Sequence, residues 1–312
     1  MRWLYAPEYD YGRGVPGSPT EVHGFVLDKP SRIRRALIEA GVAGEDDFER
    51  PEPATEGDFQ GLHSPRLLAE LHDPEAIALA IEQPELAALP AEILWQAVVA
   101  PQLHAAGGTC VALAAAAAGE WAANLSGGYH HARPSLSHGF CLVNDVALAV
   151  QRLRQGGARP RILIVDLDLH QGDGNASFFR RDPQVFTFSM HEEALFPIPK
   201  AESDLDVGLP SGTGDAIYLA ALDEALARID ARFEPEIVVY VAGSDPYEGD
   251  PLGTLAVSAK ALAERDRRVA VYAAARGCGL AAVTAGGYSP ASPILSAAGF
   301  AEIAANEPRR GS

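Results

Sequence analysis

Cysteine is scarce in this sequence of 312 residues, which contains only Cys110, Cys141 and Cys278. Their number is odd, and their wide spacing fits neither a zinc knuckle nor a redox pair. These two features argue against a disulfide-stapled scaffold, which is built from pairs of closely spaced cysteines. We therefore expect a reduced, cytoplasmic setting for the protein.

Basic residues are also in short supply. The chain carries 25 Lys and Arg residues against 42 Asp and Glu residues, which gives a formal net charge of −17. Because nucleic-acid binding needs a basic surface for the phosphates, we expect no nucleic-acid partner. The same charge would favour cationic substrates, such as a basic peptide tail or a polyamine, although an acidic surface also serves solubility.

Long apolar runs are lacking as well. The longest, around residues 111–118, is rich in alanine and too short to cross a bilayer. The first residues, MRWLYAPEY, do not show the charged-then-apolar pattern of a signal peptide. We expect no membrane segment.

What the chain does contain is an alternation of strand-like and helix-like segments, and 47% of its residues are hydrophobic. Short apolar runs predict strands at residues 3–6, 121–125, 162–165, 185–189, 237–241 and 280–284. Helices are predicted at residues 30–40, 142–153, 175–181, 216–229 and 258–275, with a largely helical region over 64–118. Loops rich in Gly and Pro are expected before Pro19 and, as one long connection, around Phe196.

This alternation is typical of a central, mostly parallel sheet covered by helices on both faces. No stretch of linker-like composition divides the sequence. We therefore predict a single α/β domain over residues 1–312, with its active site at the carboxyl edge of the strands.

The segment RILIVDLDLHQGDG, residues 161–174, carries the most informative pattern. An apolar run typical of a fully buried strand ends in Asp166, Asp168, His170 and Asp173. Because side chains alternate along an extended chain, Asp166, Asp168 and His170 would point the same way and could bind a metal. A solvated acidic turn is the plainer alternative, since Asp and Gly are common in turns.

Three further groups of polar residues follow predicted strands in the same manner. His130 and His131 follow the strand at 121–125, Asp245 follows 237–241, and Tyr288 follows 280–284. Each has an ordinary explanation when taken alone: adjacent surface histidines, the start of a turn, or a packed tyrosine. Because parallel strands end at one edge of a sheet, we expect all of these residues to line one pocket.

Together these side chains suit the metal-assisted hydrolysis of an amide. Asp168, His170 and Asp245 would form an open zinc site, although iron(II) also fits two carboxylates and one imidazole. The other members of the pocket would act around the metal: His131 as general base, Asp166 and Asp173 as hydrogen-bond partners of the tandem histidines, and Tyr288 as oxyanion donor.

Five motifs occur in a fixed order: SGGYHHA (126–132), GFCLVNDVALA (139–149), VDLDLHQGDG (165–174), AGSDPYEGDPLG (242–253) and AGGY (285–288). Together they resemble the zinc-dependent histone deacetylases, which have the arginase/deacetylase fold. The resemblance covers nearly the whole chain and includes KPSRIR (29–34). HQGDG, SMHEE and DVGLPSGTGDAIYLAAL are most similar to class IV deacetylases and their bacterial relatives.

The resemblance implies a role for each residue that matches a family motif. Zinc would be bound by Asp168, His170 and Asp245, and the tandem histidines His130 and His131 would be backed by Asp166 and Asp173 respectively. The substrate would meet the Gly139 carbonyl, Tyr288, and the tunnel walls Phe140 and Phe196. A structural potassium ion would be held by Asp166, Asp168, His170, Ser189 and Met190. Arg32 matches the arginine at the floor of the pocket, and Gln171 replaces the second histidine of the more familiar HHGDG.

The resulting prediction is zinc-dependent hydrolysis of an Nε-acyl-lysine in a peptide or protein, with an acylated polyamine as the alternative substrate. Two rivals remain. A binuclear manganese ureohydrolase needs more ligands than Asp245 and Asp250 offer in their loop, because two metals share carboxylates. A catalytically silent module that binds acyl-lysine would be marked by loss of a ligand or of Tyr288, and neither is lost.

Overall fold

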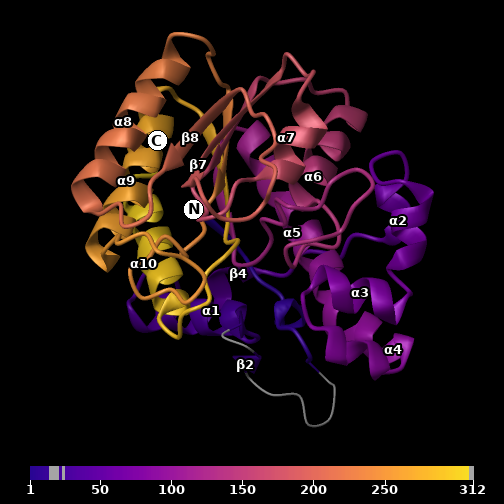
Figure 1. The fold of residues 1–312 in the computed structure, drawn as a ribbon. Helices are drawn as coiled ribbons and strands as arrows, with labels where there is room; N and C mark the ends of the chain where they lie inside the picture. Colours follow the sequence, from indigo (N-terminus) through magenta and orange to yellow (C-terminus); the bar gives the residue numbers. More distant parts are fainter. Residues whose placement is uncertain (14–20, 23–24, 309–312) are drawn as a thin grey trace.

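The computed structural model describes residues 1–13, 21–22 and 25–308, and its centre is one eight-stranded sheet (Figure 1). All neighbouring strands in this sheet are parallel. Their order is β4 (Phe48–Glu49), β1 (Arg2–Leu4), β5 (Trp121–Asn124), β10 (Gly279–Val283), β9 (Ile237–Val241), β6 (Ile162–Asp166), β7 (Val185–Glu192) and β8 (Leu205–Leu209). A separate antiparallel pair joins β2 (Glu21–Val22) to β3 (Phe25–Val26).

Helices cover both faces of the sheet (Figure 1). One face carries α1 (Lys29–Glu39), α8 (Asp215–Asp230), α9 (Ala259–Ala275) and α10 (Ser292–Ala305). The other face carries α5 (Ala100–Ala117), α6 (Asp145–Gln155) and α7 (Asp173–Phe179), with the shorter α2 (Pro65–Glu70), α3 (Pro74–Ala80) and α4 (Ala91–Leu94) at the periphery. The predicted α/β architecture, with a parallel sheet between helical layers, is confirmed.

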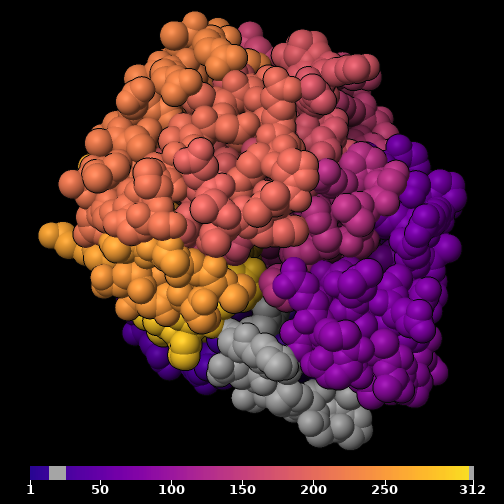
Figure 2. Space-filling view, viewed as in Figure 1, coloured from indigo at the N-terminus to yellow at the C-terminus, as the bar shows by residue number. Residues whose placement is uncertain are grey.

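Strand β6 shows why the central strands are unbroken apolar runs in the sequence. Leu163 and Val165 belong to the hydrophobic core under α8, α9 and α10, whereas Ile162 and Ile164 belong to the core under α5 and α6. Both faces of the strand are therefore buried, and each apolar residue is used on one side or the other. In the space-filling view of Figure 2, the N-terminal (indigo) and C-terminal (yellow) parts of the chain lie against one another.

One helix is longer than the apolar run in the sequence suggested. Residues Ala91–Ala117 form a continuous helix of 27 residues with a mean hydropathy of 1.3 in its most apolar window, long and apolar enough to cross a membrane. However, 67% of that window is buried inside the protein, where α5 packs against α6, β5 and β10. The helix therefore has the environment of a core helix in this fold.

Most predicted elements are present, with ends that shift by a few residues. The helix predicted at 142–153 begins at Asp145, because the side chain of Asn144 accepts a hydrogen bond from the Ala147 amide (2.8 Å) and caps it. The long loop predicted around Phe196 was partly wrong, since it ends in the edge strand β8, which pairs with β7. The loop predicted before Pro19 contains a short 3-10 helix at Pro7–Tyr9, and its residues 14–19 lie outside the described residues.

Candidate active site with a metal-binding triad

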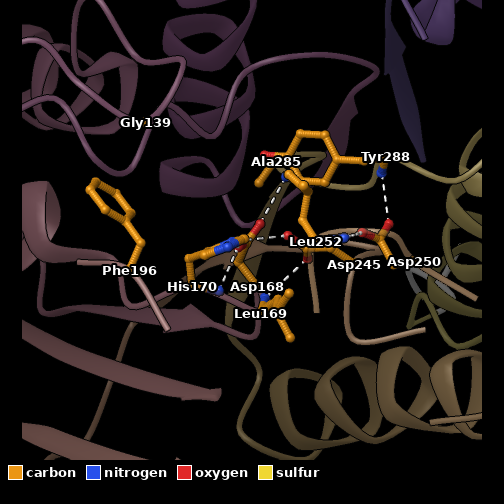
Figure 3. A network of polar contacts seen from close by, with 12 residues as sticks. Gly139, Asp168, Leu169, His170, Phe196, Asp245, Asp250, Leu252, Ala285 and Tyr288 are labelled. Carbon is orange, nitrogen blue, oxygen red and sulfur yellow. Dashed lines mark hydrogen bonds and ion pairs between the residues drawn. The ribbon is translucent and has the colours of Figure 1, made fainter. Parts of the chain in front are cut away.

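The strands that precede the predicted site residues are neighbours in the sheet, in the order β5, β10, β9, β6. They all run in the same direction, so the loops that follow them meet at one edge. Figure 3 shows the outcome: Asp168 and His170 after β6 face Asp245 after β9, and Tyr288 after β10 lies beside them. The loops after these four strands were predicted to meet at one edge of the sheet, and in the structure they do.

Asp168, His170 and Asp245 offer ligand atoms that all lie within 4.8 Å of one another. The Nδ1 atom of His170 is 3.3 Å from Asp168 Oδ1 and 3.3 Å from Asp245 Oδ2. Among the described residues, these three are the one group with this arrangement. Asp166, which we expected to point the same way, is not part of it, because the extended chain ends at that residue and bends afterwards.

Backbone amides hold the outer carboxylate atoms of the triad. The Gly286 amide donates to Asp168 Oδ2 (2.8 Å), and the Leu169 amide donates to Asp245 Oδ1 (3.0 Å). A side chain at Gly286 would place its Cβ 2.1 Å from Asp245 Oδ2, so only glycine permits this close approach of the β10 loop. The triad is thus fixed from three loops at once.

The donor set fits a divalent cation. Asp245 Oδ2 is buried and accepts no hydrogen bond from the described residues. Burial and the charge of Asp168 raise the pKa of Asp245 to about 7, which reflects two carboxylates that share a dry site. Burial lowers the pKa of His170, but Asp168 and Asp245 outweigh it and raise the pKa to about 10. A cation bound by the same oxygen and nitrogen atoms would reduce the electrostatic repulsion between the Asp168 and Asp245 carboxylates.

The tandem histidines form the two predicted carboxylate pairs. His130 Nδ1 lies 2.8 Å from Asp166 Oδ2, and His131 Nδ1 lies 2.7 Å from Asp173 Oδ1. Both rings are buried, with their centroids 4.0 Å apart. The carboxylate at each Nδ1 leaves the Nε2 atom of the ring as the one that can face the pocket.

The pKa values of the two histidines are shifted in opposite directions. Burial lowers the pKa of His130, but the charges of Asp166 and Asp168 outweigh it and raise the pKa to about 9. Burial and the neighbouring His130 lower the pKa of His131 to about 3, against the opposing pull of Asp173. His131 is therefore neutral near pH 7, as a general base must be.

Two residues around Asp173 were missed in the sequence. His138 Nε2 lies 3.1 Å from Asp173 Oδ2, and the Arg133 guanidinium donates to the same oxygen. Burial would raise the pKa of Asp173, but the nearby His131 and His138 hold it well below its usual range. Both residues lie in the loop after His131, and their polar character was the only available signal.

Tyr288 stands over the triad from the β10 loop. Its backbone amide donates to Asp250 Oδ2 (2.7 Å), so Asp250 fixes the backbone of the β10 loop at this residue. Its ring centroid is 5.6 Å from that of Phe140 and 6.5 Å from that of His170. Burial and the charge of Asp245 raise the pKa of Tyr288 well above 10, so the phenol keeps its proton and can donate it.

The two predicted tunnel walls, Phe140 and Phe196, both contact rings of the site. Gly139 and Phe140 line the pocket together with Tyr288, and Gly139 and Phe140 both have positive φ angles, 56° and 65°. The Phe196 ring lies edge-on to the His131 ring, with centroids 4.9 Å apart (Figure 3 shows Phe196 opposite Tyr288). Phe196 therefore reaches the site although its loop departs from the better-known classes.

Gln171 explains how the loop of Phe196 is held. Its side-chain amide donates to the Ala201 carbonyl (2.9 Å) and accepts from the Ala201 amide (2.7 Å), and it also donates to Asp206 Oδ1 (2.8 Å). Lys200 donates to the carbonyls of Leu195 and Phe196. The residue next to His170 thus ties the loop after β6 to the loop that carries Phe196.

We expect Gln171→Ala to lower the free energy of unfolding by about 1–3 kcal/mol, because it removes the three hydrogen bonds that this fully buried side chain makes to Ala201 and Asp206. Urea unfolding followed by circular dichroism measures this loss. The control is Arg180→Ala, which removes an exposed ion pair with Glu202 in the same loop and should cost less than about 1 kcal/mol. Equal losses in the two variants would contradict the structural role of Gln171.

The floor of the pocket corrects one prediction. Arg32 does not reach it: its side chain is 34% exposed and pairs with Asp28 (2.8 Å). Lys29 lines the pocket instead and donates to the carbonyls of Ala285 (3.0 Å) and Gly286 (2.8 Å). The helical period contained the signal, because Lys29 is four residues before the buried Ile33 and shares its face of α1.

The residues expected to hold potassium lie on two neighbouring strands. Asp166, at the end of β6, is in register with Ser189 of β7, and Met190 follows Ser189. The Ser189 hydroxyl is 2.9 Å from His191 Nδ1. The assignment of a potassium ion to this group stays a prediction.

Comparisons with known proteins identify the family of this chain. The family model of the histone deacetylase domain matches residues 23–303. An uncharacterized protein of Picosynechococcus sp. is 38% identical over 293 residues, 92% of this chain and 91% of that protein. Histone deacetylase 2 of Arabidopsis thaliana is 32% identical over 93% of this chain and 75% of its own length. Among solved structures, a homologue of histone deacetylases in complex with SAHA superposes with a TM-score of 0.76 at 25% identity, over 98% of this chain and 84% of that one.

Proposed function

Because this chain belongs to the histone deacetylase family, we propose that it is a zinc-dependent hydrolase of acyl-amides, acting first on Nε-acyl-lysine in a peptide or protein. The observation that carries the proposal is the meeting of four loops, those that follow β5, β6, β9 and β10. They bring a buried Asp-His-Asp triad, a neutral histidine backed by a carboxylate, and a protonated tyrosine into one pocket.

Each group would have a separate task. A zinc ion held by Asp168, His170 and Asp245 would supply a Lewis acid that activates water and polarises the acyl carbonyl. His131 would accept the proton from the attacking water, while Tyr288 would donate a hydrogen bond to the oxyanion that forms at the carbonyl. When the carbon–nitrogen bond breaks, His131 would return the proton to the leaving amine, which gives a carboxylate and a free amine.

The remaining side chains would orient the substrate. The acyl chain would lie between Phe140 and Phe196, and the Gly139 carbonyl would accept the hydrogen of the scissile amide. In the structure that carbonyl lies 3.3 Å from the Cys141 thiol, a weak donor that a substrate amide can displace. The proposal thus assigns the chain a tunnel for a linear acylated amine.

An acylated polyamine is a second candidate substrate. The net charge of −17 favours any cationic carrier of the acyl group, and a polyamine carries more charge per length than a lysine side chain. The binuclear manganese alternative is less favoured, because Asp250 is occupied by backbone amides. It accepts from Tyr288 (2.7 Å), Leu252 (3.0 Å) and Ser289 (3.2 Å).

Metal removal tests the proposal. We expect a chelator to abolish hydrolysis of a fluorogenic acyl-lysine peptide, and stoichiometric zinc to restore it. Iron(II) added without oxygen is the parallel arm, since the same ligands suit it. A panel of acetyl-lysine, longer acyl-lysine and acetylpolyamine substrates ranks the carriers by kcat/KM. Two manganese ions per chain, or acyl-lysine binding without turnover under all these conditions, would overturn the proposal.

A further inference from the structure

Arg265 is a buried cation in the helical layer behind the proposed metal site. It lies on α9 and is only 2% exposed. Its Nε and Nη2 atoms are both 2.8 Å from Asp266 Oδ1, and the Tyr240 hydroxyl donates to the same oxygen. This pairing offsets the cost of burying the charge, as a buried guanidinium requires.

The remaining nitrogen of this guanidinium reaches the sheet edge. Arg265 Nη1 donates to the Gly243 carbonyl (2.7 Å) and to the Leu167 carbonyl (3.2 Å). These two residues come just after strands β9 and β6 end, where the chains leave the ladder and their carbonyls lose strand partners. A buried carbonyl without a donor costs free energy, so a donor from the helix is needed there.

Both carbonyls belong to the segments that carry metal ligands. The Leu167 carbonyl is part of the peptide unit that leads into Asp168, and the Gly243 carbonyl lies one residue before the segment Ser244–Asp245. The two segments also touch, because a Cβ on Gly243 would lie 2.7 Å from Asp168 Cα and 2.4 Å from its Oδ2. The orientation of one peptide unit therefore sets the position of the other.

We propose that Arg265 is a positioning residue for the metal site: its guanidinium fixes the spacing of the Asp168 and Asp245 segments and so sets the affinity for the divalent metal. The inference rests on the metal site of the proposed function. Side chains that orient metal ligands typically contribute 10- to 100-fold to metal affinity. That is the size of effect expected here.

The test uses zinc alone as the probe, titrated in competition with a chromogenic chelator. Arg265→Met removes the donors. Arg265→Lys keeps the charge, but its single nitrogen cannot occupy both the position of Nη1 at the two carbonyls and the positions of Nε and Nη2 at Asp266. We expect each to weaken zinc binding by about 10- to 100-fold. At saturating zinc, kcat should recover towards the wild-type value, because no group that touches the substrate has changed.

The matched control is Val269→Ala, one turn along α9 and fully buried. It should lower the melting temperature, as the Arg265 variants do, while its zinc affinity stays within about threefold of the wild type. Should Arg265→Met fail to fold, Arg265→Lys decides. Unchanged zinc affinity in a folded Arg265 variant, or an equal loss in Val269→Ala, overturns the inference. A wild-type protein that binds no zinc overturns the proposed metal site itself.

Discussion

His131→Ala should lower kcat by roughly two to four orders of magnitude, the usual range for a general acid–base residue. The reason is that His131 is the tandem histidine that is neutral near pH 7, since burial and His130 lower its pKa to about 3. Its Nδ1 atom is engaged by Asp173, which leaves Nε2 to exchange a proton with the substrate. Steady-state kinetics with the acyl-lysine peptide measures the loss.

Metal content separates a catalytic role from a ligand role in this variant. His131 is not in the group of Asp168, His170 and Asp245, so His131→Ala should keep its full complement of zinc. His72→Ala is the control, because His72 is an exposed histidine that pairs with Glu56 outside the pocket, and its loss should leave kcat unchanged. Zinc lost from His131→Ala would show that the ligand set is assigned wrongly.

The central sheet could be predicted because its strands are buried on both faces. The strand at 237–241 has the observed ends, since five apolar residues in a row are needed to fill two cores. Edge strands lack this requirement. In β8 only Leu205 and Leu209 are buried, and the more exposed residues between them made the segment resemble part of a loop. Burial, more than strand propensity, decided which strands were visible in the sequence.

The site divides in a similar way. Residues directly after central strands, such as Asp168 and Asp245, could be predicted to lie close together, because parallel strands end at the same edge of the sheet. Residues that act through long-range contacts could not. Gln171 forms a hydrogen bond with Ala201, which is 30 positions away in the sequence, and Arg265 forms one with Leu167, which is 98 positions away. Such pairs depend on how loops and helices are packed, which no local pattern records.

The floor of the pocket shows the limit of a motif match. Arg32 and Lys29 both lie in KPSRIR, and the resemblance selected the arginine. The face of the helix selects the lysine, since Lys29 aligns with the buried Ile33 while Arg32 pairs with Asp28 near the surface. The motif match and the helical periodicity disagree here, and the periodicity, which places Lys29 on the buried face of the helix, identified the residue that lines the pocket.

Tyr288→Phe should lower kcat by roughly two to three orders of magnitude while the metal stays bound and the fold is kept. Removing one donor to an oxyanion typically costs about 2.7–4 kcal/mol of transition-state stabilisation. The charge on that oxygen exists only during the reaction, so the effect should appear in kcat much more than in substrate affinity. Kinetics, zinc analysis and peptide binding measure the three quantities separately.

The substitution is informative because it spares the packing of the residue. Phenylalanine keeps the ring that contacts Phe140, and the backbone amide of residue 288 can still donate to Asp250. Tyr272→Phe is the control, since it also removes a hydroxyl, the one that donates to Asp230 (2.9 Å) between α9 and α8. Full activity in Tyr288→Phe would make Tyr288 a packed aromatic and would leave the oxyanion without the donor proposed for it.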